Sequence, residues 1–405
     1  MSLLSLKGSK SVVHGVRALV LFSICFVGHA FEVKPGLTAK IPCVGAAERT
    51  IDLFIPAAYM IEATEKFPVL FMSSPSGNPN VKSLASWAER QGVIIVGINS
   101  SKNGPSDNNI QAQEAALKTV EPELRMHACL RLAMGFSGGG MAAWLLVTRH
   151  PDNFAGLLME GQCGFPNLPP KYIAVAYING DKDPNFKFIE NAESQLKRHG
   201  NPLQHLIKPG GHIQGTVEEQ SKYLDWMLEL GRMTHPKLSP ADKASAKTKV
   251  QKQLADAAKI ENAKACAAEM ERLLELPTVA EWPESRAQFP LWLQAVIKAS
   301  AGIEDKVEKH SVLNKASQRD WMQGVDAPTK RALEKELAEL RKVPAVKDEY
   351  DADAALLQAE AAERNAGVNK AQLKMVQQMY DVIAQRFPKT AAAKKAEGEA
   401  ARLKK

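Results

Sequence analysis

The sequence MGFSGGGMAAW, at residues 134–144, places a serine between a short apolar run and a stretch of small residues. Glycine loses more backbone entropy on folding than any other residue, so three glycines after Ser137 indicate a turn that larger residues cannot enter. Residues 130–134 have the apolar character of a buried strand, and residues 138–149 favour a helix. We therefore expect a tight strand–turn–helix element that holds the Ser137 hydroxyl above a sheet.

Short apolar runs alternate with helical stretches from about residue 48 to residue 232. Residues 50–55 alternate polar and apolar side chains like a half-buried strand, whereas 68–72 and 92–97 are continuously apolar, like strands covered on both faces. Further strands are expected at 130–134, 156–159, 172–178 and 203–208, with helices at 81–90, 109–119, 138–149, 186–198 and 217–230. This alternation predicts a doubly wound, mostly parallel sheet of the α/β class.

Residue usage changes after about residue 236, where Ala, Lys, Glu, Gln and Leu dominate and β-branched runs disappear. Residues 249–276 predict one long helix, and Asp326 followed by Ala-Pro is typical of a helix start. Residues 375–396 predict two helices with Thr390 as the N-cap of the second. This pair resembles the end of a tetratricopeptide-type array, although no 34-residue period precedes it. We expect an all-α region over 236–405.

The first thirty residues predict an export signal. A basic stretch precedes the apolar run 18–28, and Gly28 and Ala30 supply small residues at the positions that a signal peptidase reads. The run of 11 residues is shorter than the ~20 of a membrane-spanning helix, so we expect cleavage after Ala30 and no span in the mature chain; an uncleaved anchor is the alternative. The predicted organisation is a signal at 1–30, an α/β domain at 31–235 and the helical region at 236–405, in a secreted or periplasmic protein.

Charge and cysteine content exclude several classes of function. The formal charge of +7 falls to +4 without the three basic residues of 1–30, which is too small an excess to indicate nucleic-acid binding. Four cysteines follow the expected cleavage site, and their spacing matches neither a disulfide framework nor a metal motif. Buried free thiols are expected at Cys43, Cys129, Cys163 and Cys266, and no metal or cofactor is predicted.

An acid and a base follow the serine in the order that a nucleophile elbow requires. Residues 135–139 match G-x-S-x-G, for which the order is serine, then acid, then histidine. Asp183 and His212 each follow a predicted strand, so both fall at the carboxyl edge of the sheet, where open α/β sheets bind ligands. Asp181 in the same loop and Glu160 after the preceding strand are alternative acids. His212 as a plain turn histidine is the alternative for the base.

Residues 48–232 resemble the α/β-hydrolases, in the esterase branch with polyhydroxybutyrate depolymerases, feruloyl esterases and dienelactone-hydrolase-like proteins. The resemblance lies in the stretches FPVLF (67–71), WAERQGVIIV (87–96), GFSGGGM (135–141), HPDNFAG (150–156), GDKD (180–183) and GGH (210–212). It implies Ser137 as nucleophile, His212 as base and Asp183 as acid. The implied substrate is a small or polymer-borne carboxylic ester, with peptide and thioester chemistry left open.

One stretch departs from this family. Such esterases follow the third strand with His-Gly and a small residue whose backbone N–H helps to bind the oxyanion, whereas this chain has Ser-Ser-Pro at 73–75. Proline has no N–H, so Gly138 is one expected donor and Ser74 or Ser76 the other. Loss of one such donor costs ~10²–10³ in rate. The alternative function is therefore a catalytically inactive α/β-hydrolase scaffold whose helical C-terminal region binds a protein partner.

Overall fold

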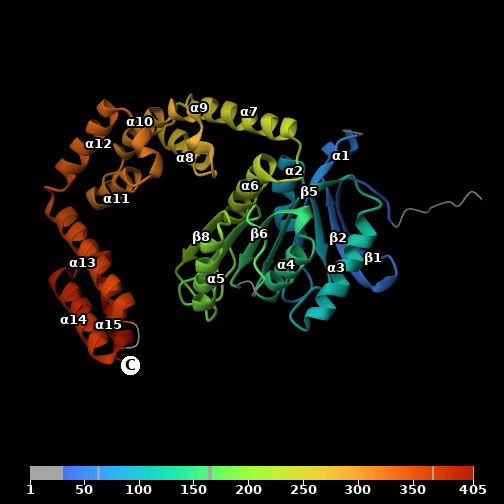
Figure 1. The fold of residues 1–405 in the computed structure, drawn as a ribbon, viewed down its shortest axis with the longest axis horizontal. Coiled ribbons are helices and arrows are strands. Elements are labelled where there is room, and N and C mark those ends of the chain that lie inside the picture. Colours follow the sequence, from blue (N-terminus) through green and yellow to red (C-terminus); the bar gives the residue numbers. More distant parts are fainter. Residues whose placement is uncertain (1–30, 62–63, 163–166, 367–368, 405) are drawn as a thin grey trace, which may run out of the picture.

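The computed structural model describes residues 31–404 apart from 62–63, 163–166 and 367–368. Its first half is a sheet flanked by helices, and its second half is helical throughout (Figure 1). The predicted class, an α/β unit followed by an all-α region, is confirmed. The expected export signal and Cys163 lie outside the described residues.

The sheet has the strand order β1-β2-β4-β3-β5-β6-β7-β8. Both pairings of β2 are antiparallel, and every pairing from β4 to β8 is parallel. The strands are β1 Gly36–Cys43, β2 Ala46–Ile55, β3 Phe67–Ser73, β4 Ile94–Ile98, β5 Met126–Phe136, β6 Phe154–Glu160, β7 Ala174–Gly180 and β8 Leu203–Lys208. This order, with β2 reversed and a strand–turn–helix after β5, is the α/β-hydrolase fold.

Helices cover both faces of this sheet, which explains the continuous apolar runs in its central strands. In β3, Leu70 and Met72 face the core formed with α2 and α6, whereas Val69 and Phe71 face the core formed with α3, α4 and α5. These helices are α2 Ala85–Gln91, α3 Ser106–Val120, α4 Gly138–Arg149, α5 Phe186–His199 and α6 Val217–Thr234; a short α1, Ala58–Ile61, precedes β3.

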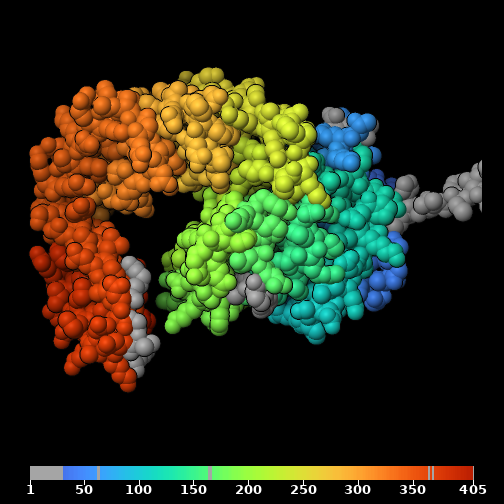
Figure 2. Space-filling view, viewed as in Figure 1, coloured from blue at the N-terminus to red at the C-terminus, as the bar shows by residue number. Residues whose placement is uncertain are grey.

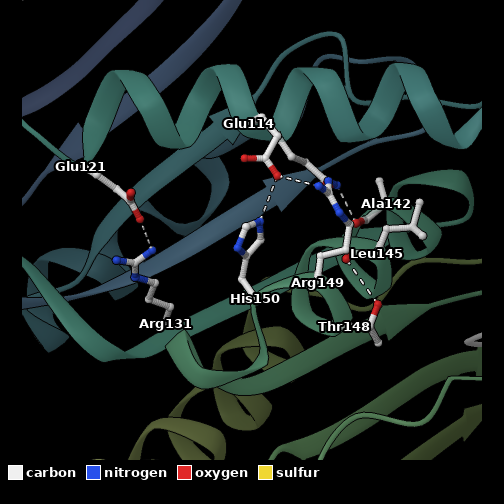
Figure 3. Close-up of polar contacts among 9 residues, drawn as sticks. Glu114, Glu121, Arg131, Ala142, Leu145, Thr148, Arg149 and His150 are labelled. Carbon is white, nitrogen blue, oxygen red and sulfur yellow. Dashed lines mark hydrogen bonds and ion pairs between the residues drawn. The ribbon is translucent and has the colours of Figure 1, made fainter.

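Ion pairs hold α3 against the far end of α4 (Figure 3). Glu114 of α3 accepts hydrogen bonds from Arg149 at 2.8 Å and from His150 at 3.1 Å. Glu121, just beyond α3, pairs with Arg131 of β5 at 2.7 Å. Because α4 has 12 residues, the contacts of Arg149 and His150 lie roughly 18 Å from its first residue. The contacts of Glu114 therefore fix the far end of the helix that follows Ser137, away from the serine.

The C-terminal region contains the helices α7 Pro240–Ala257, α8 Ala263–Leu274, α9 Pro283–Arg286, α10 Phe289–Ser300, α11 Lys306–Ser317, α12 Ala327–Leu340, α13 Pro344–Ala366, α14 Lys370–Arg386 and α15 Ala391–Leu403. The single helix expected at 249–276 is wrong, because Asn262 ends its continuity by capping α8 with a 3.0 Å bond from the N–H of Ala265. The caps at Asp326 and Thr390 are confirmed, with bonds of 2.9 and 3.0 Å to backbone N–H groups three residues on.

The packing of the helical region does not follow the change in residue usage at residue 236. One hydrophobic core runs from the α6 face of the sheet into α7, α8, α10, α11 and α12. The last three helices, α13 to α15, have a core of their own, and Figure 2 shows open space between them and the α/β unit. No helix among the described residues is long and apolar enough to cross a membrane.

Candidate active site

Ser137 lies in a strained turn between β5 and α4. Its φ and ψ are 52° and −124°, a left-handed conformation that residues other than glycine rarely adopt. The Ser137 N–H donates to the carbonyl oxygen of Glu160 at 2.8 Å, which ties the turn to the end of β6. Such a turn ends the strand and exposes the serine hydroxyl above the edge of the sheet.

The glycines around Ser137 are required by close backbone contacts. A Cβ on Gly135 would lie 2.3 Å from the carbonyl carbon of Gly139, and a Cβ on Gly139 would lie 2.5 Å from the carbonyl oxygen of Ser73. Real Cβ atoms essentially never approach so closely. The run of glycines therefore lets α4 start directly against the ends of β3 and β5.

His212 and Asp183 form a hydrogen-bonded pair at the same edge of the sheet. His212 Nδ1 lies 2.9 Å from Asp183 Oδ2, and the Asp183 side chain is fully buried whereas that of His212 is 32% exposed. The other oxygen of Asp183 accepts from the N–H of Asn185 at 2.8 Å, which fixes the carboxylate. The His212 ring centroid lies 4.7 Å from that of Phe136, the residue before Ser137. The fold thus brings the acid and the base together beside the strained turn.

The two alternative acids have other partners. Asp181 accepts a bond from the N–H of Gly210 at 2.9 Å and so closes the loop that leads to His212. Glu160 is fully buried and accepts bonds from Gly215 N–H at 2.8 Å and from Gln220 at 2.9 Å. Burial raises the pKa of Glu160, and the two hydrogen bonds oppose this rise only in part. Among these three acids, Asp183 is the one bonded to His212.

Ser74 and Ser76 lie in a tight turn after β3. Their hydroxyl oxygens are 3.2 Å apart, and Ser74 Oγ also accepts from the N–H of Asn78 at 2.9 Å. The turn abuts the elbow, since a Cβ on Gly139 would lie 2.7 Å from Ser74 Cα. The backbone of Ser74 therefore lies close to the start of α4, where the N–H of Gly138 is also found.

Asn103 is a neighbour of the elbow that the sequence did not single out. Its Oδ1 lies 1.6 Å from the position that a Cβ on Gly138 would take. No sequence motif carries this contact, because Asn103 belongs to the irregular segment between β4 and α3. In the sequence, only the glycine at position 138 indicates that another group occupies the place of a side chain there.

A cavity of about 230 Å³ lies between the turn after β3 and the loop that follows His212. It is smaller than the ~300–1,000 Å³ of drug-sized ligand sites. Its lining includes Ser74, Phe136, Glu160, Gln214 and Gln220. The lining is partly polar and adjoins the turn that carries Ser137.

The described cysteines are inert in character. Cys43, Cys129 and Cys266 are buried free thiols, as expected, and burial raises the pKa of each. Across the part of the chain that the structure describes, no cluster of three or more His, Cys, Asp or Glu side chains is placed to hold a metal ion.

Comparison with known proteins gives likenesses to solved structures alone. No protein-family model matches the sequence, and no curated protein matches it. A ferulic acid esterase is 18% identical, with 45% of this chain and 92% of that one covered and a TM-score of 0.36. An S-formylglutathione hydrolase from Staphylococcus aureus is 11% identical, with 49% and 100% covered and a TM-score of 0.38. A carboxylesterase from Bacillus cereus is 15% identical, with 45% and 95% covered and a TM-score of 0.36. The fold is assigned from the strand order itself.

Proposed function

We propose that this protein is a serine hydrolase that cleaves carboxylic esters through Ser137, His212 and Asp183. The observation that carries the proposal is the 2.9 Å bond between His212 Nδ1 and Asp183 Oδ2. The bond engages Nδ1 and leaves Nε2 of the imidazole free of the acid, and the ring packs in a tilted arrangement against Phe136, the residue that precedes Ser137. A histidine oriented by a buried carboxylate is what a serine hydroxyl needs to become a nucleophile.

The proposed reaction has two halves. His212 Nε2 takes the proton of Ser137 as its oxygen attacks the ester carbonyl, and the resulting oxyanion is stabilised by the N–H of Gly138. The C–O bond to the leaving group then breaks, and His212 donates the proton to the departing alcohol. A water molecule, deprotonated by the same imidazole, hydrolyses the acyl-serine and restores the enzyme. Asp183 holds the ring and stabilises its positive charge throughout.

We propose that the acyl group binds in the cavity that Gly135 and Phe136, the two residues before Ser137, help to line. Its volume of about 230 Å³ and its partly polar lining suit a small acyl group better than a long apolar chain. We propose export of the protein as well, which would place the ester outside the cytoplasm; peptide and thioester substrates stay open. A protein partner bound to the C-terminal helices stays a prediction.

Labelling with a fluorophosphonate probe tests the proposal. We expect the wild-type protein and His150→Gln to be labelled at similar rates, because His150 pairs with a glutamate at the far end of α4. Ser137→Ala and His212→Ala should not be labelled, and Asp183→Asn should be slowed by ~10²–10⁴. Labelling of Ser137→Ala at the wild-type rate would refute the assignment of the nucleophile. A wild-type protein that neither reacts with the probe nor hydrolyses short-chain esters would leave the inactive scaffold as the function.

A further inference from the structure

The turn that lacks a donor at Pro75 is held by a second loop. The N–H of Ser100 donates to the carbonyl oxygen of Gly77 at 3.1 Å, and the N–H of Asn103 donates to that of Pro75 at 3.0 Å. Ser100 has a φ of 76°, so this loop holds a conformation that is costly for serine. The backbone of Asn103 is therefore bonded to Pro75, the residue that lacks the N–H expected to bind the oxyanion.

The Asn103 side chain lies on the first residue of α4. Its Oδ1 is 1.6 Å and its Cγ 2.7 Å from the position of a Cβ on Gly138, so the carboxamide fills the place of the missing side chain. The terminal torsion of asparagine is broad, and its oxygen and nitrogen exchange places by rotation of the amide. Either orientation keeps an amide group beside the Gly138 N–H.

We propose that the Asn103 side-chain amide is the second oxyanion donor of this enzyme, acting with the N–H of Gly138. The inference rests on the proposed serine hydrolase function. A carboxamide nitrogen carries two donors and no charge, which suits an oxyanion that forms only during the reaction. In the described structure Asn103 is exposed, so substrate binding would also remove water from around this amide.

The nearby hydroxyl groups are less suited to this role. Ser74 Oγ accepts the N–H of Asn78 and contacts Ser76 Oγ, and Ser73 Oγ donates to Ser101 Oγ at 3.3 Å. These contacts hold the turn after β3 in place. The backbone N–H of Asn103 is bonded to Pro75 and its exposed carboxamide contacts Gly138, so the side chain can turn toward the substrate while its backbone stays fixed.

Steady-state hydrolysis of a short-chain p-nitrophenyl ester tests the role of Asn103. We expect Asn103→Ala to lower kcat by ~10²–10³ with little change in KM, because the donor acts on the transition state. Affinity for a trifluoromethyl ketone, which forms the same oxyanion on Ser137, should fall by the same factor as kcat/KM. The control is Asn108→Ala, which removes the 3.0 Å bond from Asn108 to Ser100 in the same loop and leaves Asn103 in place.

A second pair of variants uses the contact with Gly138. A Cβ in Gly138→Ala meets the flexible end of Asn103, so it should displace the amide and keep the Gly138 N–H. We expect Gly138→Ala to lose about as much kcat as Asn103→Ala, and the double variant to lose no more than either one. Full additivity of the two losses would refute the shared role.

The outcomes separate this inference from the proposed function. An active wild-type enzyme with kcat unchanged in Asn103→Ala overturns the inference and leaves the triad standing. Equal losses in Asn108→Ala and Asn103→Ala assign both residues to loop order and also overturn it. A wild-type protein without activity overturns the inference together with the function on which it rests.

Discussion

Replacing Glu160 should separate the stability of the site from its chemistry. The Glu160 carboxylate accepts from Gly215 N–H and from Gln220, and both donors lie in or next to the segment between His212 and α6. Glu160→Ala leaves the buried Gln220 amide and the half-buried Gly215 N–H without this acceptor, at about 1–3 kcal/mol for the first and at most that for the second. We therefore expect a loss of about 1–6 kcal/mol in the free energy of unfolding. A loss of kcat should accompany it, because the histidine loop is no longer held.

Glu160→Gln is the matched variant, and its effect depends on pH. Its amide oxygen can still accept from Gly215, and it carries no charge to bury. Burial raises the pKa of Glu160, so the folded protein binds its proton more tightly than the unfolded chain does. The wild-type free energy of unfolding should therefore decrease as pH rises above the usual glutamate pKa of ~4.3 until the raised pKa is passed. The glutamine variant should lack this decrease.

Urea unfolding of the three proteins at pH 5 and pH 8 measures both effects. Glu160→Gln should gain stability relative to wild type between pH 5 and pH 8, and Glu160→Ala should be the least stable at both. The reasoning fails if Glu160→Gln is as unstable as Glu160→Ala at pH 8, or if Glu160→Ala loses less than about 1 kcal/mol.

Three further variants test other parts of the structure. Burial lowers the pKa of His235 to about 4, so the unfolded chain binds a proton at this residue before the folded protein does. The free energy of unfolding should therefore fall by up to about 3 kcal/mol as pH drops from ~6.5 to ~4. Urea titrations of His235→Phe should lack this fall. Gly139→Ala should abolish fluorophosphonate labelling and lower the melting temperature, because its Cβ would meet the carbonyl oxygen of Ser73 at 2.5 Å and backbone atoms cannot yield cheaply; wild-type labelling would contradict this. Asn262→Ala should cost about 1 kcal/mol through the lost cap of α8, whereas an unchanged midpoint would assign that break to packing alone.

The sequence predicted the central strands well because their burial on both faces leaves continuous apolar runs. It missed β1, whose residues GLTAKIPC pair with β2 alone at the edge of the sheet and alternate only weakly in burial. It also merged α7 and α8, because helix-favouring residues continue through the break and Asn262 reads equally as a surface residue. Periodicity records which faces are buried, and it carries little information where a strand is exposed or where one side chain ends a helix.

For the candidate site, too, features carried by local sequence were predictable and contacts between distant segments were not. Chain order and strand ends were sufficient to bring Ser137, Asp183 and His212 into one hypothesis. They could not separate Asp183 from Asp181, because both residues lie in one loop. Only the fold shows that the Asp181 carboxylate accepts from Gly210 and that of Asp183 contacts His212. The contact between Asn103 and Gly138 could not be predicted for the same reason, since it joins the loop after β4 to the first residue of α4.

The helix α6 links the candidate active site to the C-terminal region. It begins three residues after Gln214 with a capping box at Thr216, and its first turn pairs with the end of β8 through Glu219 and Lys208 at 2.7 Å. Near its far end, Glu229 pairs with Arg272 of α8 at 2.6 Å. The core that packs one face of α6 on the sheet continues without a gap into α7 and α8. The helix that follows the His212 loop is therefore held from two sides, so the packing of α7 and α8 against α6 contributes to the order of that loop.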